Sequence, residues 1–361
     1  MDVSICPECR VPEPFSQGQV WLNNGDIVQR INSEARVGFI ECENLDPLFA
    51  NIGDIIGTSI ESMIVNITTR GVERYMGKLV PAEVKEMVQA KQMYPGVFTD
   101  PVMTYCHIVG YGKYEFVRSR YERDEEDFSV FRILEPFSVP EAAGSLAGAI
   151  SAVVGGEHAV SYEETSPGLY EFTTSWTEYP EVLVERLQPT PYRHQDGDIE
   201  LKRCATCGAP AALAGFRWYL DRGLIVNKHT GRRMAILGPE LMDAVFMALE
   251  AELGETIPNV VVEAQRRFVK TGFYSIDEVS DEGDFRTQLA LRGMGNLQEI
   301  RMDSRGMHLR VDSAAVHLLT VGMVQGLFEM AFDMPSDVEW ELSDGGDLEV
   351  EVRPRKVMET V

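Results

Sequence analysis

The chain has 361 residues, with 57 Asp and Glu against 33 Lys and Arg, and a formal net charge of −24. This acidic average field repels a phosphate backbone and an anionic membrane surface, and no Lys/Arg tract offers a local exception, so we expect neither nucleic-acid nor membrane partners. No apolar run reaches the roughly 18 residues of a membrane helix, and the first residues lack the basic and apolar regions of a signal peptide. We therefore expect a cytoplasmic, folded protein.

The sequence repeats itself at a nearly constant offset, which chance similarity does not do over long stretches. The offset is 197 or 198 up to about residue 70, then 183, then 178, because the second copy is shorter. Matched pairs include Cys6 with Cys204, Gly57 with Gly254, Gly110 with Gly293 and Gly144 with Gly322. We predict a first repeat at 1–190, a polar, proline-containing linker at 191–202 and a second, shorter repeat at 203–361.

The elements expected in the first part of one copy follow from alternation, helical periodicity and capping residues. Strands are predicted within Gln19–Val28 and at Arg36–Ile40. A helix opened by Asp46-Pro47 and closed near Gly57 comes next. A second helix is predicted at about 59–78, and the first copy then adds a helical insert near 80–100, with its helix at about Ala82–Gln92.

The remainder of each copy is predicted to be mainly strand. In the first copy we expect strands near Val102–Val109 and Tyr114–Ser119 on either side of a hairpin turn at 110–112. A strand at 129–134, a small-residue helix at 140–154 and a hairpin at 159–174 complete the unit. The predicted fold class is α/β of the α+β type, with two largely antiparallel units related by a pseudo-two-fold axis.

Each copy begins with a Cys-x-x-Cys motif, formed by Cys6 with Cys9 and by Cys204 with Cys207. Such a turn presents two thiolates on one side of a tight knuckle, and two knuckles make one tetrahedral zinc site. Because the second copy has no third cysteine, the two pairs must then share one metal and tie the halves together. A redox dithiol and plain structural cysteines are the alternatives, although neither pair follows a strand and opens a helix as thioredoxin-like motifs do.

Other residue patterns carry weaker chemical signals. Cys106 and His107 occur only in the first copy, and neighbours on the predicted strand would point to opposite faces, so adjacency alone does not make them a catalytic pair. Gly110-Tyr111-Gly112-Lys113 lacks the spacing of a phosphate loop and is interpreted as a turn that needs positive φ. Repeated arginines are expected to pair with carboxylates, with anion binding by Arg70 and Arg267 as the alternative.

The segment from Phe137 through Gly144 and Gly148 to Val160–Glu164 resembles the C-terminal part of the 4-vinyl-reductase domain. This resemblance implies a fold related to trafficking-particle subunits and binding of a hydrocarbon-like small molecule, and some members of that family carry a zinc site. The cysteines that the family places near its terminal strands are missing here, where the Cys-x-x-Cys turns stand instead at the start of each copy.

Together these patterns predict a non-enzymatic, zinc-stabilised small-molecule-binding, scaffold or sensor protein with an apolar pocket between helices. The ligand would be apolar or anionic, and a protein partner or self-association is compatible with the surface. The pocket is expected around Phe49 and Phe246, with Ile52, Ile56, Ile60, Met63, Leu249 and Ile257 as further lining. The alternative is a redox-active or catalytic protein that uses the dithiols or Cys106 and His107 of the first repeat.

Overall fold

A computed structural model describes residues 3–177, 191–279 and 281–355. The first half of the chain contains, in order, α1 (Glu13–Gly18), β1 (Gln19–Trp21), β2 (Ile27–Gln29), β3 (Asn32–Glu41), α2 (Cys42–Ile56), α3 (Glu61–Leu79), α4 (Ala82–Gln89), η1 (Pro95–Phe98), α5 (Thr99–Ile108), β4 (Lys113–Arg120), β5 (Phe128–Leu134), α6 (Val139–Val154), β6 (Glu157–Ser166) and β7 (Leu169–Thr177).

The second half follows a similar order of elements. It contains η2 (Ala211–Gly215), β8 (Phe216–Tyr219), β9 (Leu224–Asn227), β10 (Arg233–Leu237), α8 (Pro239–Leu253), α9 (Ile257–Phe268), η3 (Val269–Phe273), η4 (Ile276–Val279), α10 (Glu282–Leu291), β11 (Asn296–Asp303), β12 (Gly306–Asp312), α11 (His317–Phe332), β13 (Ser336–Leu342) and β14 (Leu348–Pro354). The predicted mixed α/β class is confirmed.

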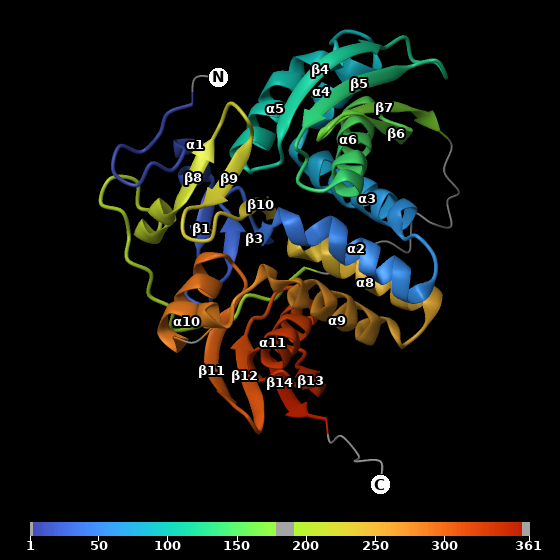
Figure 1. Cartoon of the computed structure of the whole chain (residues 1–361). Helices are drawn as coiled ribbons and strands as arrows, with labels where there is room; N and C mark the ends of the chain where they lie inside the picture. The colour runs from blue at the N-terminus through green and yellow to red at the C-terminus, as the bar shows by residue number, and fades with distance from the viewer. Residues whose placement is uncertain (1–2, 178–190, 280, 356–361) are drawn as a thin grey trace.

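The described strands form three sheets. A central six-stranded sheet has the order β1-β2-β3-β10-β9-β8, and two four-stranded sheets have the orders β4-β5-β7-β6 and β11-β12-β14-β13. All the strand pairings among the described residues are antiparallel, and β3 pairs with β10 so that Met234 lies opposite Glu41 and Leu237 opposite Gly38. In Figure 1 the two four-stranded sheets lie at opposite ends of the molecule, with α2 and α8 running between them.

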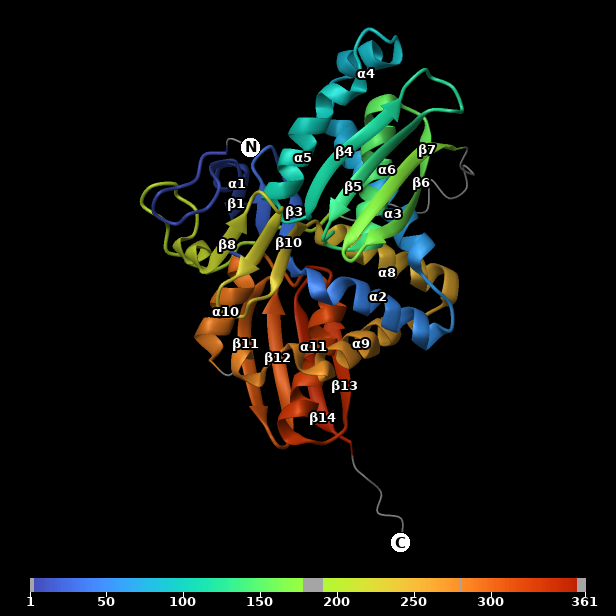
Figure 2. The ribbon, with the colours of Figure 1, turned by 45° about the horizontal axis from the view of Figure 1, so that its top comes forward.

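The two halves exchange contacts reciprocally across the central sheet. The indole Nε1 of Trp21 donates to the carbonyl of Leu291, and that of Trp218 donates to the carbonyl of Ile108, both at 3.0 Å. In the same way α2 packs on α9, and α3 packs on α8. The N-terminal part of each half is therefore held by the C-terminal part of the other, as Figure 2 shows for the central strands between the two outer sheets.

The small-residue helices explain why glycines recur at matched positions in both halves. A Cβ on Gly144 or Gly148 of α6 would lie 2.5 Å or 2.3 Å from a carbonyl oxygen of α3. On α11, a Cβ on Gly322 would lie 2.5 Å from the carbonyl of Val262 in α9. Glycine thus permits the close approach of the two helices in each half.

Three local predictions differ from the structure. The stretch expected as strand 102–109 is the helix α5, because Val102 and Cys106, one helical turn apart, both face a cavity and this tertiary context overrides β propensity. Gly110 and Gly112 do have positive φ, but they connect α5 to β4 and do not form a hairpin turn. Residues 19–28 form two strands, since the polar turn at Gly25 lies between them.

The helix α2 begins earlier than predicted. It starts at Cys42, with Pro47 inside it, and ends at Gly57 in the left-handed region as expected. Asp46 does not cap its own helix, because its carboxylate accepts a hydrogen bond from the backbone N–H of Val139 at the start of α6. The side chain that signals a helix start in the sequence therefore caps a different helix.

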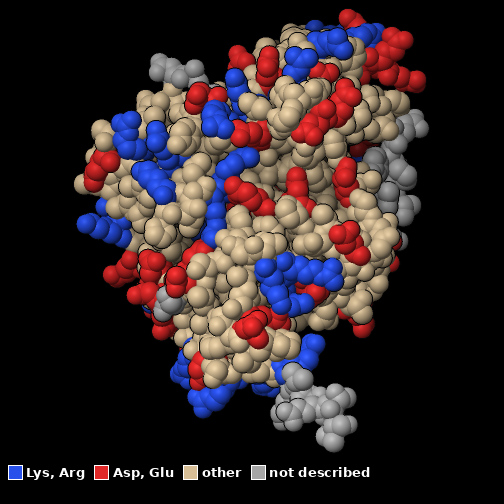
Figure 3. All heavy atoms as spheres, viewed as in Figure 1, with Lys and Arg blue, Asp and Glu red and all other residues tan. Residues whose placement is uncertain are grey.

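Charge is unevenly distributed over the surface. On the face shown in Figure 3, acidic side chains gather at the turn between β4 and β5, where Glu122, Asp124, Glu125 and Glu126 are exposed.

Among the described residues, no helix is long and apolar enough to cross a membrane. The linker predicted at 191–202 contains neither helix nor strand, and the predicted end of the first repeat at residue 190 lies outside the described residues.

Candidate ligand cavity and metal centre

The two Cys-x-x-Cys motifs fold into matching knuckles. In the first, the N–H of Cys6 donates to the carbonyl of Val11 and the N–H of Arg10 donates to the carbonyl of Cys6. Equivalent bonds run from Cys204 to Ala209 and from Gly208 to Cys204. The residue after the second cysteine has positive φ in both knuckles, 63° at Arg10 and 75° at Gly208, so the tight turn forms in both halves.

The four cysteine sulfurs of the knuckles converge on one point. Sγ of Cys6 lies 3.8 Å from Sγ of Cys204, and Sγ of Cys9 lies 3.5 Å from Sγ of Cys207. All four sulfurs lie within 4.8 Å of one another. A zinc ion with bonds of about 2.3 Å to sulfur spaces its four sulfurs about 3.8 Å apart, so this donor set fits a tetrahedral metal.

The surroundings of the knuckles lower the pKa of the Cys6 thiol, whereas burial raises the pKa of the Cys9 thiol. The N–H of Cys9 is the main cause that lowers the pKa of Cys6 to about 7. Across the junction, the Glu8 carboxylate accepts hydrogen bonds from the N–H and the hydroxyl of Thr206. The knuckles pack in one apolar cluster with the central sheet, and they lie side by side at the left edge of the molecule in Figure 1.

A large cavity lies mainly in the first half, and none of the four knuckle cysteines lines it. Its volume is about 770 Å³, within the usual range of about 300–1,000 Å³ for small-molecule sites. The walls come from α3, α5, α6, β4 and β5, and from β3 and β10 of the central sheet. The lining includes ten Phe and Tyr residues, among them Tyr75, Phe98, Tyr111, Tyr114, Phe116, Phe131 and Phe137.

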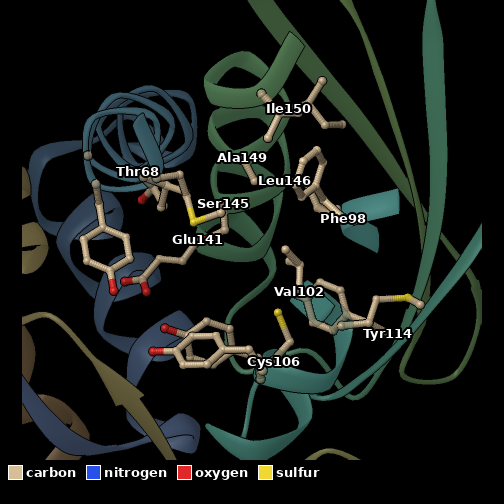
Figure 4. Close-up of a pocket in the computed structure, with 18 of the residues that line it drawn as sticks. Thr68, Phe98, Val102, Cys106, Tyr114, Glu141, Ser145, Leu146, Ala149 and Ile150 are labelled. Carbon is tan, nitrogen blue, oxygen red and sulfur yellow. The ribbon is translucent and has the colours of Figure 1, made fainter. Parts of the chain in front are cut away.

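Glu141 is the acidic side chain that projects from α6 into this cavity (Figure 4). The residue is 7% exposed, and among the described residues its carboxylate has no hydrogen-bond or ion-pair partner. Burial, with a smaller contribution from the charge of Asp46, raises its pKa to about 8. A buried carboxyl without a partner is costly, so this group is available to a ligand.

Three tyrosine hydroxyls of the cavity lining differ in their hydrogen bonding. The hydroxyl of Tyr114 is buried without a hydrogen-bond partner among the described residues. The hydroxyl of Tyr111 donates to the carbonyl of Ile236 at 2.9 Å, and that of Tyr75 donates to Oε1 of Gln29 at 2.6 Å. The unused hydrogen-bonding capacity of the cavity therefore includes Glu141 and Tyr114.

Cys106 and His107 face different surroundings on α5. Cys106 lines the cavity (Figure 4), and burial raises the pKa of its thiol to about 12. Nε2 of His107 instead accepts a hydrogen bond from the backbone N–H of Tyr114 at 2.9 Å. The thiol is thus protonated at neutral pH, and His107 is already engaged with the backbone, which disfavours the pair as nucleophile and base.

In the second half the matching interior positions carry larger or more apolar side chains. At the offset of 178, Glu141 corresponds to Leu319, Ser145 to Met323 and Ala149 to Leu327. Leu319 and Leu327 are 7% and 1% exposed. The same helix thus lines a cavity in the first half and is packed with aliphatic groups in the second.

The ligand-binding residues predicted from sequence lie elsewhere. Phe49 lines a second hollow of about 660 Å³ beside Asp46 and Tyr162, while Phe246 is buried in the core. Arg70 pairs with Glu73 and Glu157. Arg267, which is exposed, pairs with Glu263 at 2.8 Å. None of these four predicted residues is among those that line the large cavity.

Glu141 was not singled out by sequence reasoning, although a signal for it was present. Ser138 and Glu141 have the spacing of a capping box, in which the glutamate normally returns to the cap N–H. The comparison that could have found it is Glu141 against Leu319 at the repeat offset, which places a charge where the other copy has a core residue.

No family model matches the sequence, and no curated protein matches it either. The likeness of residues 137–164 to the 4-vinyl-reductase domain therefore remains a resemblance.

Several solved structures are similar to part of the chain. An H-NOX protein studied for heme distortion has 15% identity and a TM-score of 0.25, covering 34% of this chain and 75% of that one. The I5F mutant of T. Tengcongensis H-NOX has 13% identity and a TM-score of 0.24, with 34% and 76% covered. The phenol-responsive sensory domain of the transcription activator PoxR with phenol has 13% identity and a TM-score of 0.29, with 46% and 89% covered.

Proposed function

We propose that this protein binds a small, largely apolar molecule in the first half and acts as a ligand-binding or sensor protein. The observation that carries the proposal is the cavity of about 770 Å³ lined by aromatic and aliphatic side chains. Such a lining with a few polar groups is typical of small-molecule sites. The filled interior of the second half supports a division of labour in which that half serves as the scaffold.

We further propose that the two halves arose from one α/β unit and are clamped by a single zinc ion held by all four knuckle cysteines. The spacing of the sulfurs and the reciprocal contacts between the halves support this proposal. The central strands β3 and β10, which pack with the knuckles, also form one wall of the cavity. A metal at the knuckles would therefore stabilise the sheet on which the ligand rests.

A redox or catalytic role has less support from the geometry. The four sulfurs form one cluster shared between the halves, which favours metal binding over two separate dithiols. Cys106 has a raised thiol pKa, and His107 accepts a backbone hydrogen bond on another side of the helix. The binding function is therefore preferred.

Calorimetric titration of the full chain tests the binding proposal. The probes are 4-phenylbutan-1-ol and 4-phenylbutylamine, two molecules of similar shape and size. We expect at least one to bind the wild type and to lose most of its affinity in Ala149→Phe, which fills the cavity. The matched control is Ala82→Phe, an exposed position on α4, which should bind like the wild type. Equal affinity in wild type and Ala149→Phe would contradict the proposal.

A further inference from the structure

If the protein has the proposed binding function, the position of Glu141 restricts the chemistry of its ligand. The start of α6 is satisfied without this carboxylate. The N–H of Glu141 donates to Oγ of Ser138 at 3.4 Å, and the N–H of Val139 donates to Asp46 at 3.1 Å. The Glu141 side chain therefore has no capping role, although the sequence pattern would allow one.

Two of the basic side chains that line the cavity are already paired with carboxylates other than Glu141. Arg36 is bound to Asp26 in an ion pair at 2.6 Å, with both side chains fully buried. Arg120 pairs with Asp127 at 3.0 Å and also with Asp124. A group that arrives in the cavity and carries a positive charge would meet an unpaired carboxyl in a low-dielectric setting, where an ion pair is strongest.

The aromatic lining also favours a cation. Rings attract an ammonium group through the negative charge on their faces. Tyr111 and Phe137 stack with their ring centroids 4.3 Å apart, and Phe116 and Phe131 meet edge to face at 5.5 Å. The same rings provide the apolar surface that would cover a hydrocarbon chain.

We infer that the cavity of the first half binds a lipophilic organic amine as its ammonium cation, ion-paired to Glu141 and surrounded by the aromatic side chains. At the matching position the second half has Leu319, whose side chain is uncharged. The hydroxyl of Tyr114 is the second polar group that faces the ligand (Figure 4).

The test compares 4-phenylbutylamine with 4-phenylbutan-1-ol on the full chain, by calorimetric titration at one buffered pH of about 9, where the Glu141 carboxylate is ionised and the amine is still a cation. We expect the amine to bind wild type at least about tenfold more tightly than the alcohol, which corresponds to about 1.4 kcal/mol. Glu141→Gln, which keeps the shape and removes the charge, should abolish this preference. Glu83→Gln changes an exposed glutamate of α4, outside the cavity lining, and should retain the preference.

The outcomes distinguish failure of the amine inference from failure of the proposed binding function. If amine and alcohol bind wild type equally well, the ligand is neutral, and the inference is overturned while the binding function stands. If the preference survives in Glu141→Gln, the assignment to Glu141 is wrong. If neither probe binds any variant, the binding function itself fails. Thermal unfolding of each variant confirms that the compared proteins are folded.

Discussion

The interiors of the two halves differ far more than their backbones do. Gly144 and Gly322 permit the same close approach of helices, so α6 and α11 occupy equivalent places. Yet the first helix presents Ala149 to a cavity, whereas the second presents Leu327 to the core, where that residue is 1% exposed. One helix framework thus supports either a binding site or a packed core, and a few side chains decide which.

The regions that are alike in both halves serve the junction between them. The tryptophan contacts of β1 and β8 are reciprocal, and so are two backbone bonds: the N–H of Phe39 donates to the carbonyl of Arg292 at 2.8 Å, and that of Ile236 donates to the carbonyl of Val109 at 2.9 Å. The knuckles follow the same symmetry. We infer that the junction constrains both halves equally, whereas their interiors are free to differ.

Removal of the two cysteines of one knuckle is expected to have the largest effect on stability, because the knuckles join the two halves. Wild type should carry one zinc per chain, and Cys204→Ser/Cys207→Ser should lose it. The free energy of unfolding should fall by more than about 4 kcal/mol, because metal binding is coupled to folding. Metal content by elemental analysis and unfolding in denaturant measure both effects.

The mirror variant makes this prediction sharper. Cys6→Ser/Cys9→Ser should have the same effect, since each knuckle supplies half of one site. Cys106→Ala, which changes a cysteine outside the cluster, should keep the metal. Retention of half the zinc in each double variant would mean separate sites and would refute the shared clamp.

Matched substitutions inside the two halves should have opposite consequences. Leu327→Ala empties a packed position and should cost about 2–5 kcal/mol of unfolding free energy. Ala149→Leu adds a side chain where the cavity has room, so it should be neutral or stabilising while it weakens binding of 4-phenylbutylamine. Denaturant unfolding gives both values. Equal destabilisation by the two changes would show that the first interior is as tightly packed as the second.

The sequence predicted the parts of the molecule that local rules determine. The knuckle cysteines follow from their spacing and from the positive φ that Gly208 allows. The helix α6 follows from its small residues, and the hairpin of β6 and β7 from alternation. In these segments local propensity and tertiary packing agree.

The cavity depends on contacts between distant segments, which periodicity does not show. Val102 and Cys106 belong to a run with strand propensity that becomes helical because α5 packs over the cavity. Phe49 was a reasonable pocket residue by pattern, yet it lines the smaller hollow. Apolar residues of a core and of a binding site follow the same pattern, so only a charge among them, as at Glu141, distinguishes the two.

The smallest effect for a single measured step is a pH dependence that belongs to the first half. The pKa of Glu141 is raised in the fold, so the protonated form is the one that folding favours. The protonated Glu141 carboxyl adds to the free energy of unfolding. This added stability is fully present below the ordinary carboxyl pKa and is lost as pH rises toward about 8. Between those limits the loss is at most about 1.4 kcal/mol for each pH unit.

The comparison of wild type with Glu141→Gln isolates this contribution. Asp46, Glu240 and Asp243 also have raised pKa values because they are buried, but they are present in both proteins, so their effects cancel except for the coupling of Asp46 to Glu141. Denaturant unfolding at pH 5, 6 and 7.5 should show the variant gaining stability relative to wild type as pH rises. Parallel curves would mean that Glu141 titrates normally, and the difference between the two interiors would then be one of volume and not of charge.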